Sequence, residues 1–461
     1  MLAIFSSNGE AQHLDRRPTV PIGFTIIPAP SEHASYRSYR AAIVDPRAPS
    51  PSLQLIRVND TSFTKDQGTE FVSWIEGGKR ALILRVDFPD GICMTDQNDS
   101  TCGGDPIHDD FRIAHMRLDV CVVKGSSLVG CPSVKFRKDR NIPTNVYFGP
   151  YFYNWAPQAF YDYRGELSEF VFQTHAVSPA YVPKPGEQSD VEMWRMDIDG
   201  SRSAKIVEAN ANAHGCQISP NQQLMVCERR RQGGIGDTDF VLTRSDGSER
   251  RFLGADEREP SLLMRWSPDS RFLVYFTEKG GKQRLVYQNV EDFDRLGDSV
   301  NHKILDNGSE PAYYCIHQDG LCGLLGDPDD VGSDYPAFSP LLLGQQHPKF
   351  LALAVKKPLG TPLKNQRGIQ KFKRVLHVIP MDGGATKEIQ CRGAIGYPTF
   401  SPGGDAIAFL STPSWDEPRT QLFVVQWKTW KTECDCKQLT FVKKGRQIYN
   451  PRWELYSWSH N

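Results

Sequence analysis

The stretch Trp266-Ser-Pro-Asp-Ser-Arg-Phe-Leu-Val-Tyr275 has the form of a β-hairpin, with a bulky residue, a Ser-Pro-Asp turn and an apolar strand in succession. Pro fixes φ at the second turn position, and Asp, Asn or Gly tolerates the conformation that reverses the chain. The same form recurs in Ile218-Ser-Pro-Asn-Gln-Gln-Leu-Met-Val-Cys227 and Phe400-Ser-Pro-Gly-Gly-Asp-Ala-Ile-Ala-Phe409. This recurrence predicts a protein built from repeated small sheets.

A second hairpin follows the first in several of these units. The segments Glu192–Gly200, Asp239–Gly247 and Arg374–Gly383 each end an apolar strand at Asp-Gly, which is a strong signal for a two-residue hairpin turn. One unit therefore contains four predicted strands, and no convincing amphipathic helix separates the units. Four-stranded units that repeat without helices predict a β-propeller.

The pattern resembles the TolB-type propeller family, whose units carry a W/F-S-P-D-G-x-x-I-x-F hairpin followed by a strand that ends in Asp-Gly. The resemblance covers most of residues 192–440 and implies an all-β propeller. TolB-like propellers often accompany a serine peptidase domain, which would need a G-x-S-x-G nucleophile motif. That motif is absent from this sequence, so we do not expect a serine peptidase.

The bulky residues that end the inner strands give the number of blades. They are Trp74, Trp155, Ile218, Trp266, Phe338, Phe400 and Trp453. Only eight residues follow Trp453, so the last blade needs the strands predicted near the N-terminus at 23–27, 40–44 and 53–58. We expect a single all-β propeller of seven four-stranded blades, closed by pairing of the N- and C-terminal strands. Six blades are the alternative if Trp155 begins no blade.

The same count sets the predicted domain limits. Residues 1–20 are an N-terminal extension and residues 21–461 are the propeller, with the inner strand of one blade within about 449–457. The composition of 39% hydrophobic and 24% charged residues suits a packed core. The 54 basic residues balance 55 acidic ones, which argues against nucleic-acid binding. No apolar run approaches the roughly 18 residues of a membrane span, so no transmembrane segment is expected.

The cysteines and sequons favour the secretory pathway. Eleven cysteines include short-range pairs that suit disulfide bonds, although buried free thiols are the alternative. These pairs are Cys93 with Cys102, Cys121 with Cys131, Cys216 with Cys227, and Cys315 with Cys322. Glycosylation sequons lie at Asn59, Asn98 and Asn307. Against secretion, the apolar segment Met1–Phe5 is too short for the core of a signal peptide.

The residues just before each inner strand converge near the axis of a propeller. They are polar or aromatic and predict a ligand site for a glycan or a protein partner. The ligand-binding candidates are Glu70, Tyr151, Asn154, Gln217, Asp334, Tyr449 and Arg452. The alternative is that some of them pack in the channel or form hydrogen bonds to the next blade.

Residues at the same predicted ligand site also form a candidate catalytic set. A His and a Tyr can act as base and acid, and an Arg can neutralise a carboxylate. This composition resembles seven-bladed polysaccharide lyases that act on uronic acids, and the resemblance implies roles for His214, Tyr335 or Tyr397, and Arg265. We favour a binding or scaffold propeller, and a carbohydrate-active enzyme (lyase or glycosidase) is the alternative.

No cofactor is expected. The acidic loops 105–110 and 327–334 offer oxygen ligands for Ca²⁺, but neither has EF-hand spacing, and such loops are usually solvated turns. Calcium therefore remains an alternative. The sequence gives no indication of the oligomeric state.

Overall fold

A computed structural model of the chain describes most of the predicted strands and the turns between many of them. The described residues are 21–28, 40–46, 54–55, 67–87, 115–124, 127–130, 158–161, 167–175, 191–197, 203–207, 213–230, 238–248, 251–253, 261–279, 282–290, 302–304, 336–342, 344–358, 372–391, 393, 395–411, 420–432, 435–442 and 446–453. Within them the fold is all-β, as predicted. A 3-10 turn that lies wholly within these ranges is η2 (Glu76–Gly78).

The strands form seven four-stranded sheets with antiparallel pairing. The first sheets along the chain are β28 (Arg446–Arg452), β1 (Ile22–Pro28), β2 (Arg40–Val44), β3 (Gln54–Leu55); β4 (Gln67–Ile75), β5 (Arg80–Asp87), β6 (His115–Lys124), β7 (Ser127–Val129); and β8 (Gln158–Tyr161), β9 (Leu167–His175), β10 (Val191–Asp197), β11 (Ser203–Val207).

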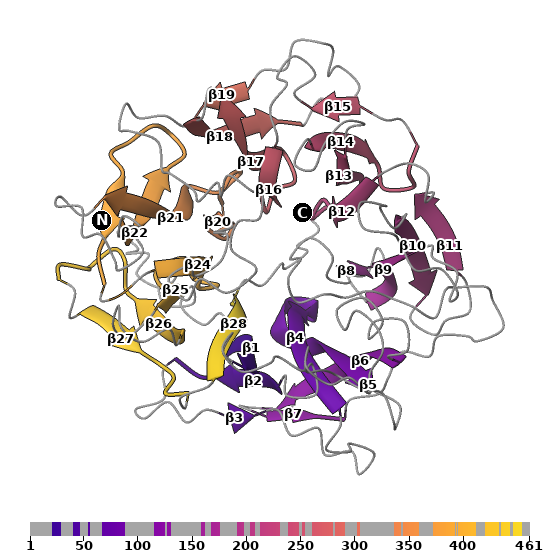
Figure 1. Cartoon of the computed structure of the whole chain (residues 1–461), viewed down its shortest axis with the longest axis horizontal. Coiled ribbons are helices and arrows are strands. Elements are labelled where there is room, and N and C mark those ends of the chain that lie inside the picture. Colours follow the sequence, from indigo (N-terminus) through magenta and orange to yellow (C-terminus); the bar gives the residue numbers. More distant parts are fainter. Residues whose placement is uncertain are drawn as a thin grey trace, which may run out of the picture.

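Four further sheets follow the same order from the first strand to the last. They are β12 (Ala213–Ile218), β13 (Leu224–Arg230), β14 (Thr238–Arg244), β15 (Arg251–Leu253); β16 (Ser261–Trp266), β17 (Phe272–Lys279), β18 (Lys282–Asn289), β19 (His302–Ile304); β20 (Ala337–Phe338), β21 (Phe350–Pro358), β22 (Phe372–Pro380), β23 (Lys387–Ile389); and β24 (Ile395–Phe400), β25 (Ile407–Ser411), β26 (Gln421–Val425), β27 (Cys436–Gln438). Figure 1 shows the sheets around a common centre, with β4, β8, β12, β16, β20, β24 and β28 nearest to it.

The two ends of the chain meet in one sheet. β28 pairs with β1, with Ile448 opposite Ile26 and Arg452 opposite Gly23, and Figure 1 shows the yellow strand beside the indigo one. A Cβ atom at Gly23 would lie 2.2 Å from the ring of Phe71 on β4, so only glycine permits this close approach. Trp453 is buried in the same hydrophobic cluster as the N-terminal residues of β1.

One of the bulky residues that were predicted to end an inner strand needs correction. The third sheet along the chain begins with β8, which starts at Gln158 and follows Trp155 in the sequence. Trp155 therefore does not end the inner strand of this sheet, and Tyr161 occupies that place instead. The error has a simple cause, since Trp155-Ala-Pro imitates the bulky-Ser-Pro form without forming the turn between β8 and β9.

The Ser-Pro turns owe their shape to the serine hydroxyl. The backbone N–H of Leu224 donates to Ser219 Oγ at 2.9 Å, and Phe272 and Ala406 donate in the same way to Ser267 and Ser401 at 2.9 and 3.0 Å. The left-handed residue is the third after the serine, with φ of 61° at Gln222, 62° at Ser270 and 69° at Gly404. Asn221 and Asp269 come one residue earlier, and their side chains accept hydrogen bonds from Gln223 N and Arg271 N.

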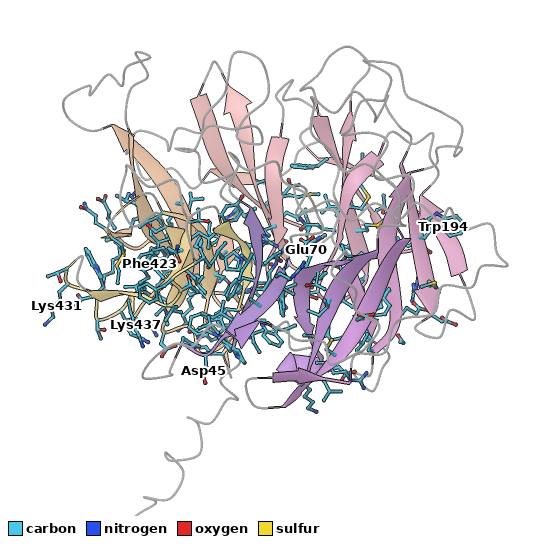
Figure 2. The ribbon with its side chains drawn as sticks, turned by 60° about the horizontal axis from the view of Figure 1, so that its bottom comes forward. Asp45, Glu70, Trp194, Phe423, Lys431 and Lys437 are labelled. Atoms are coloured by element: carbon cyan, nitrogen blue, oxygen red, sulfur yellow. A yellow bond between two sulfur atoms is a disulfide. The ribbon has the colours of Figure 1, made fainter. Side chains whose placement is uncertain are left out.

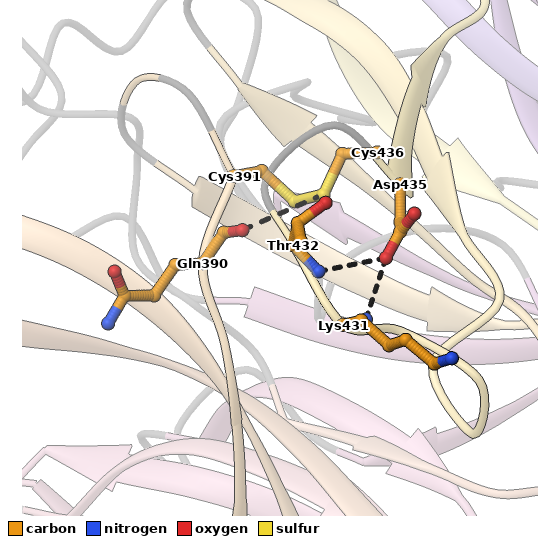
Figure 3. The surroundings of a disulfide bond; sticks show 6 residues. All are labelled: Gln390, Cys391, Lys431, Thr432, Asp435 and Cys436. Carbon is orange, nitrogen blue, oxygen red and sulfur yellow. Dashed lines mark hydrogen bonds between the residues drawn. A yellow bond between two sulfur atoms is a disulfide. The ribbon is translucent and has the colours of Figure 1, made fainter.

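Two disulfide bonds are described. Cys216–Cys227 joins β12 to β13 as predicted, with a Cα–Cα distance of 4.0 Å. Cys391–Cys436 was not predicted, and it links the segment after β23 to β27 of the next sheet, with a Cα–Cα distance of 6.0 Å (Figure 3). Cys121 is also disulfide-bonded. The other candidate cysteines and sequons lie outside the described residues; they are Cys93, Cys102, Cys131, Cys315, Cys322, Asn59, Asn98 and Asn307.

Within the described ranges no helix is long and apolar enough to cross a bilayer.

Candidate functional site

The candidate site is a set of polar residues that precede the bulky ends of the inner strands. A β-bulge interrupts the pairing of β4, β12, β16, β24 and β28 just before these residues. Bulges re-aim side chains while the strand continues, and here they repeat at one register position. The residues that follow the bulges are Ser73, Gln217, Arg265, Thr399 and Arg452.

Two members of this set form hydrogen bonds between neighbouring sheets. Gln217 Nε2 donates to the backbone oxygen of Met264 on β16 at 3.2 Å. Thr399 Oγ1 accepts a hydrogen bond from the backbone N–H of Trp453 at 3.4 Å. These two side chains therefore connect one inner strand to the next, which is the alternative that the sequence left open.

The tryptophans of the inner strands form a second connection between neighbouring sheets. The indole N–H of Trp266 donates to the backbone oxygen of Gln217, and that of Trp74 donates to the backbone oxygen of Arg452, both at 3.1 Å. The side chains of Arg265 and Arg452 are half-buried at the same register position. Charge-assisted hydrogen bonds between an arginine and an anion are strong in partly buried surroundings.

Glu70 on β4 is a titratable group of the described residues whose pKa is strongly shifted. Only 9% of its surface is exposed. Burial raises its pKa from 4.5 to about 8, and the positive charge of Arg452 offsets part of that shift. Figure 2 shows Glu70 toward the middle of the molecule, whereas Lys431 and Lys437 lie at its periphery. At neutral pH the carboxyl is mostly protonated, so it can donate a hydrogen bond as well as accept one.

Some of the other predicted site residues lie in the described strands, and the rest lie outside the described residues. His214 and Tyr449 lie on β12 and β28, where their backbones pair with Glu228 and Thr25. Tyr397 is 9% exposed and belongs to a hydrophobic cluster, with a left-handed φ of 53°. Tyr151, Asn154, Asp334 and Tyr335 lie outside the described residues. The catalytic roles of His214, Tyr335, Tyr397 and Arg265 therefore stay predictions.

The electrostatic interaction between Glu70 and Arg452 was not predicted, although both residues were candidates. The signal that could have found it is the register. If β28 precedes β4 around the centre, the residue before Trp453 falls next to the strand that carries Glu70. Among the described residues no cluster of three or more His, Cys, Asp or Glu side chains could hold a metal ion. Both acidic loops proposed for calcium fall in the undescribed part of the chain.

Comparison with known proteins identifies the class of fold. No family model matches the sequence, and no curated protein matches it. A solved prolyl endopeptidase structure is 10% identical, with 93% of this chain and 50% of that chain covered and a TM-score of 0.51. The chain thus spans about half the length of that endopeptidase.

Two further solved structures are similar at lower TM-scores. One is a putative TolB from Agrobacterium tumefaciens (13% identity, 64% of this chain and 89% of that chain, TM-score 0.37). The other is an oligogalacturonate lyase from Vibrio parahaemolyticus (8% identity, 81% of this chain and 83% of that chain, TM-score 0.44). The described residues are all-β, and the fold is similar to that of TolB-like β-propellers. At these identities the likeness concerns the fold alone.

Proposed function

We propose that residues 21–461 form one closed seven-bladed propeller that binds an acidic glycan at its polar axial face. The observation that carries this proposal is the position of Arg265 and Arg452, two half-buried arginines at one register position of two inner strands. Glu70, protonated at neutral pH, adds a hydrogen-bond donor beside Arg452. A protein partner with surface carboxylates is the other ligand for which the same groups are suited.

Support for the closed ring comes from the junction of the chain ends. The seven sheets share one strand order, and the sheet that contains β28 is completed by β1, β2 and β3. Closing a ring in this way removes two exposed sheet edges. Residues 1–20 would then be an extension outside the ring.

The chemistry of the site favours carboxylates over neutral sugars. A guanidinium group binds a carboxylate through two parallel N–H···O bonds, and partial burial strengthens them. Uronic acid residues carry one carboxylate on each sugar ring, so two arginines can engage two sugars of one chain. Location in the secretory pathway fits both this ligand and the disulfide bonds, which persist in oxidising compartments.

The test is calorimetric titration of the full chain with oligogalacturonates, with neutral cello-oligosaccharides as the comparison. We expect binding of the acidic oligomers, weakened about tenfold or more by Arg265→Gln or Arg452→Gln. Lys431→Gln, which removes an exposed cation after β26, should leave the affinity unchanged. Equal affinity for neutral oligomers, or no effect of either arginine substitution, would refute the proposal.

The same titration distinguishes binding from catalysis. Lyase action would produce unsaturated uronates, whose ultraviolet absorbance increases with time. If that signal appears, the protein is a carbohydrate-active enzyme, and His214→Ala should abolish it.

A further inference from the structure

A hydrogen bond joins His347 to Asp269 across two neighbouring sheets. His347 lies on the connection between β20 and β21, and Asp269 lies on the turn between β16 and β17. Nδ1 of His347 donates to Oδ2 of Asp269 at 2.8 Å. The side chain of Asp269 is 6% exposed, whereas that of His347 is 43% exposed. The imidazole ring is therefore anchored at one nitrogen and still accessible to a ligand.

The carboxylate of Asp269 has a separate role within its own turn. Its Oδ1 accepts hydrogen bonds from Ser267 Oγ and, at 3.2 Å, from the backbone N–H of Arg271. Its Oδ2 is the atom that contacts His347. Both oxygens are thus engaged, and the turn and the imidazole use different ones.

The other two Ser-Pro turns show that this type of turn forms without a cation. The fourth residue after the serine is Arg271 in the turn after β16, and it is Gln223 and Asp405 in the turns after β12 and β24. All three turns keep the hydrogen bond to the serine hydroxyl. The guanidinium group of Arg271 is therefore not required for the shape of its turn.

Arg271 lies beside the second nitrogen of the imidazole. Its Nη1 is 3.4 Å from Nε2 of His347. The ring of Phe272 packs edge-on against the imidazole, with 5.5 Å between the ring centroids and 73° between the planes. When an imidazole is neutral and donates from Nδ1, its Nε2 is an acceptor, so Arg271 can donate to it. These contacts fix the position of the imidazole ring.

Protonation of the imidazole reverses the role of Nε2. Both ring nitrogens of an imidazolium are donors, so Nε2–H and Nη1 of Arg271 then face each other and neither can accept from the other. Two like charges at this separation repel, and an anion that accepts from both groups removes the repulsion. Asp269 cannot serve as that anion because its oxygens already accept from Nδ1 and from the turn.

The other described charges on the elements around this pair are few. They are Lys349 on the same connection, Asp382 on the turn after β22 and Asp405 on the turn after β24. Each of these two carboxylates accepts a hydrogen bond within its own turn, at 3.2 and 2.7 Å. The turn after β12 and the end of β18 also contact the turn that carries Arg271, and their described residues 219–223 and 288–290 include no charged side chain. These contacts leave the anion to be supplied by a ligand.

We propose that Arg271 and His347 form a binding site for a tetrahedral oxyanion, a sulfate or phosphate group, which binds when the imidazole is protonated. Asp269 is the positioning residue that holds the ring. Such a group carries up to two negative charges on several acceptor oxygens, so it accepts from the guanidinium and the imidazolium together. The proposal is independent of the axial site, since the pair lies on connections between strands and uses neither Arg265 nor Arg452.

The test follows the imidazole of His347 by NMR in the full chain, isotope-labelled at histidine Cε1. The signal of His347 is identified by its loss in His347→Gln. Sodium sulfate is the probe because its charge stays constant between about pH 5.5 and about pH 7.5, and sodium chloride keeps the ionic strength constant. We expect a saturable shift of this signal, with an affinity about tenfold higher near pH 5.5 than near pH 7.5, because an ordinary imidazole gains its proton between these values.

Two substitutions test whether the site is specific. Arg271→Gln should weaken sulfate binding about tenfold or more, and the turn after β12 already contains glutamine at this position, so the fold should be kept. Lys349→Gln is the matched control, since it removes a neighbouring exposed cation and should change the affinity by less than about twofold. Circular dichroism of both variants should match that of the parent.

Other anions define the ligand further. Phosphate should act like sulfate, whereas acetate, which is planar and singly charged, should shift the signal little. Methyl sulfate distinguishes the two sources of the group, since a site for an ester binds it and a site for the free ion alone does not.

Three outcomes would overturn the proposal. The absence of a saturable shift at either pH would show that the pair binds no oxyanion. Equal losses in Arg271→Gln and Lys349→Gln, or an equal response to acetate, would show general attraction to a cationic surface and an adventitious ion only. An affinity that does not change with pH would show that the proton of the imidazole plays no part.

Discussion

The indole N–H of Trp74 donates a hydrogen bond to the backbone oxygen of Arg452, 3.1 Å away in space and 378 residues away in sequence. The same bond connects Trp266 to Gln217, at 3.1 Å and a separation of 49 residues. In each case the acceptor directly precedes the bulky residue that ends an inner strand. The contact between the sheet that contains both chain ends and the sheet that begins with β4 therefore repeats the contact between two consecutive sheets.

Replacing Trp74 with Phe tests how much this bond contributes. The substitution keeps an aromatic ring in the core but leaves the oxygen of Arg452 without this donor. We expect the free energy of unfolding, measured in urea, to fall by about 1–3 kcal/mol. Trp266→Phe is the matched control and should have a similar effect. If Trp266→Phe destabilises the protein and Trp74→Phe does not, the bond between Trp74 and Arg452 contributes nothing to stability.

The repeated hairpins were predictable because their local chemistry is in the sequence. The conformation of a Ser-Pro or Asp-Gly turn is determined by a few neighbouring residues, so it can be read from the local sequence. Ile218, Trp266 and Phe400 accordingly lie at the ends of inner strands, as predicted. The predicted pairing of an N-terminal strand with a C-terminal one is observed between β1 and β28.

Contacts between sheets were not predictable in the same way. Cys391 and Cys436 are 45 residues apart and belong to different sheets, and nothing local marks them as partners. The raised pKa of Glu70 likewise depends on burial by chain segments that are remote in sequence. Glu70 and Arg452 were selected separately as candidates, and their proximity comes from the order of the sheets.

The turn after β24 provides a second prediction. Gly404 has a φ of 69°, and a Cβ atom there would lie 3.4 Å from the ring of Pro340 in the preceding sheet. Gly404→Ala should lower the free energy of unfolding by about 1–2 kcal/mol because an L-residue is strained in this conformation. Gly403→Ala, one residue earlier, is the control, since its Cβ would meet only the movable side chain of Asp405. Equal effects of the two substitutions would contradict this explanation.

The two disulfide bonds should differ in their contribution to stability. In the chain-entropy account a longer closed loop gives a larger stabilisation. Cys391–Cys436 closes 45 residues and Cys216–Cys227 closes 11. Removing each pair by double substitution to Ala should cost about 4 and 3 kcal/mol respectively. Thermal unfolding of both variants under non-reducing conditions makes the comparison. A larger loss for the shorter loop would show that local packing outweighs the loop entropy.

The raised pKa of Glu70 predicts that the free energy of unfolding falls as the pH rises. Its pKa is about 8 in the folded protein against 4.5 for the ordinary carboxyl. Between these values the folded state holds a proton that the unfolded state has released, so each unit of pH increase favours unfolding. The stabilisation is complete below pH 4.5 and is lost as the pH rises through about 8.

The substitution Glu70→Gln isolates this contribution because the amide resembles the protonated carboxyl but does not titrate. Near pH 5 the variant should match the parent, and near pH 9 it should be the more stable, by about 1.4 kcal/mol for each unit of the pKa difference at most. Urea unfolding across this pH range measures both proteins. If the stabilities of Glu70→Gln and the parent stay equal near pH 9, the carboxyl of Glu70 is not held in its protonated form by burial.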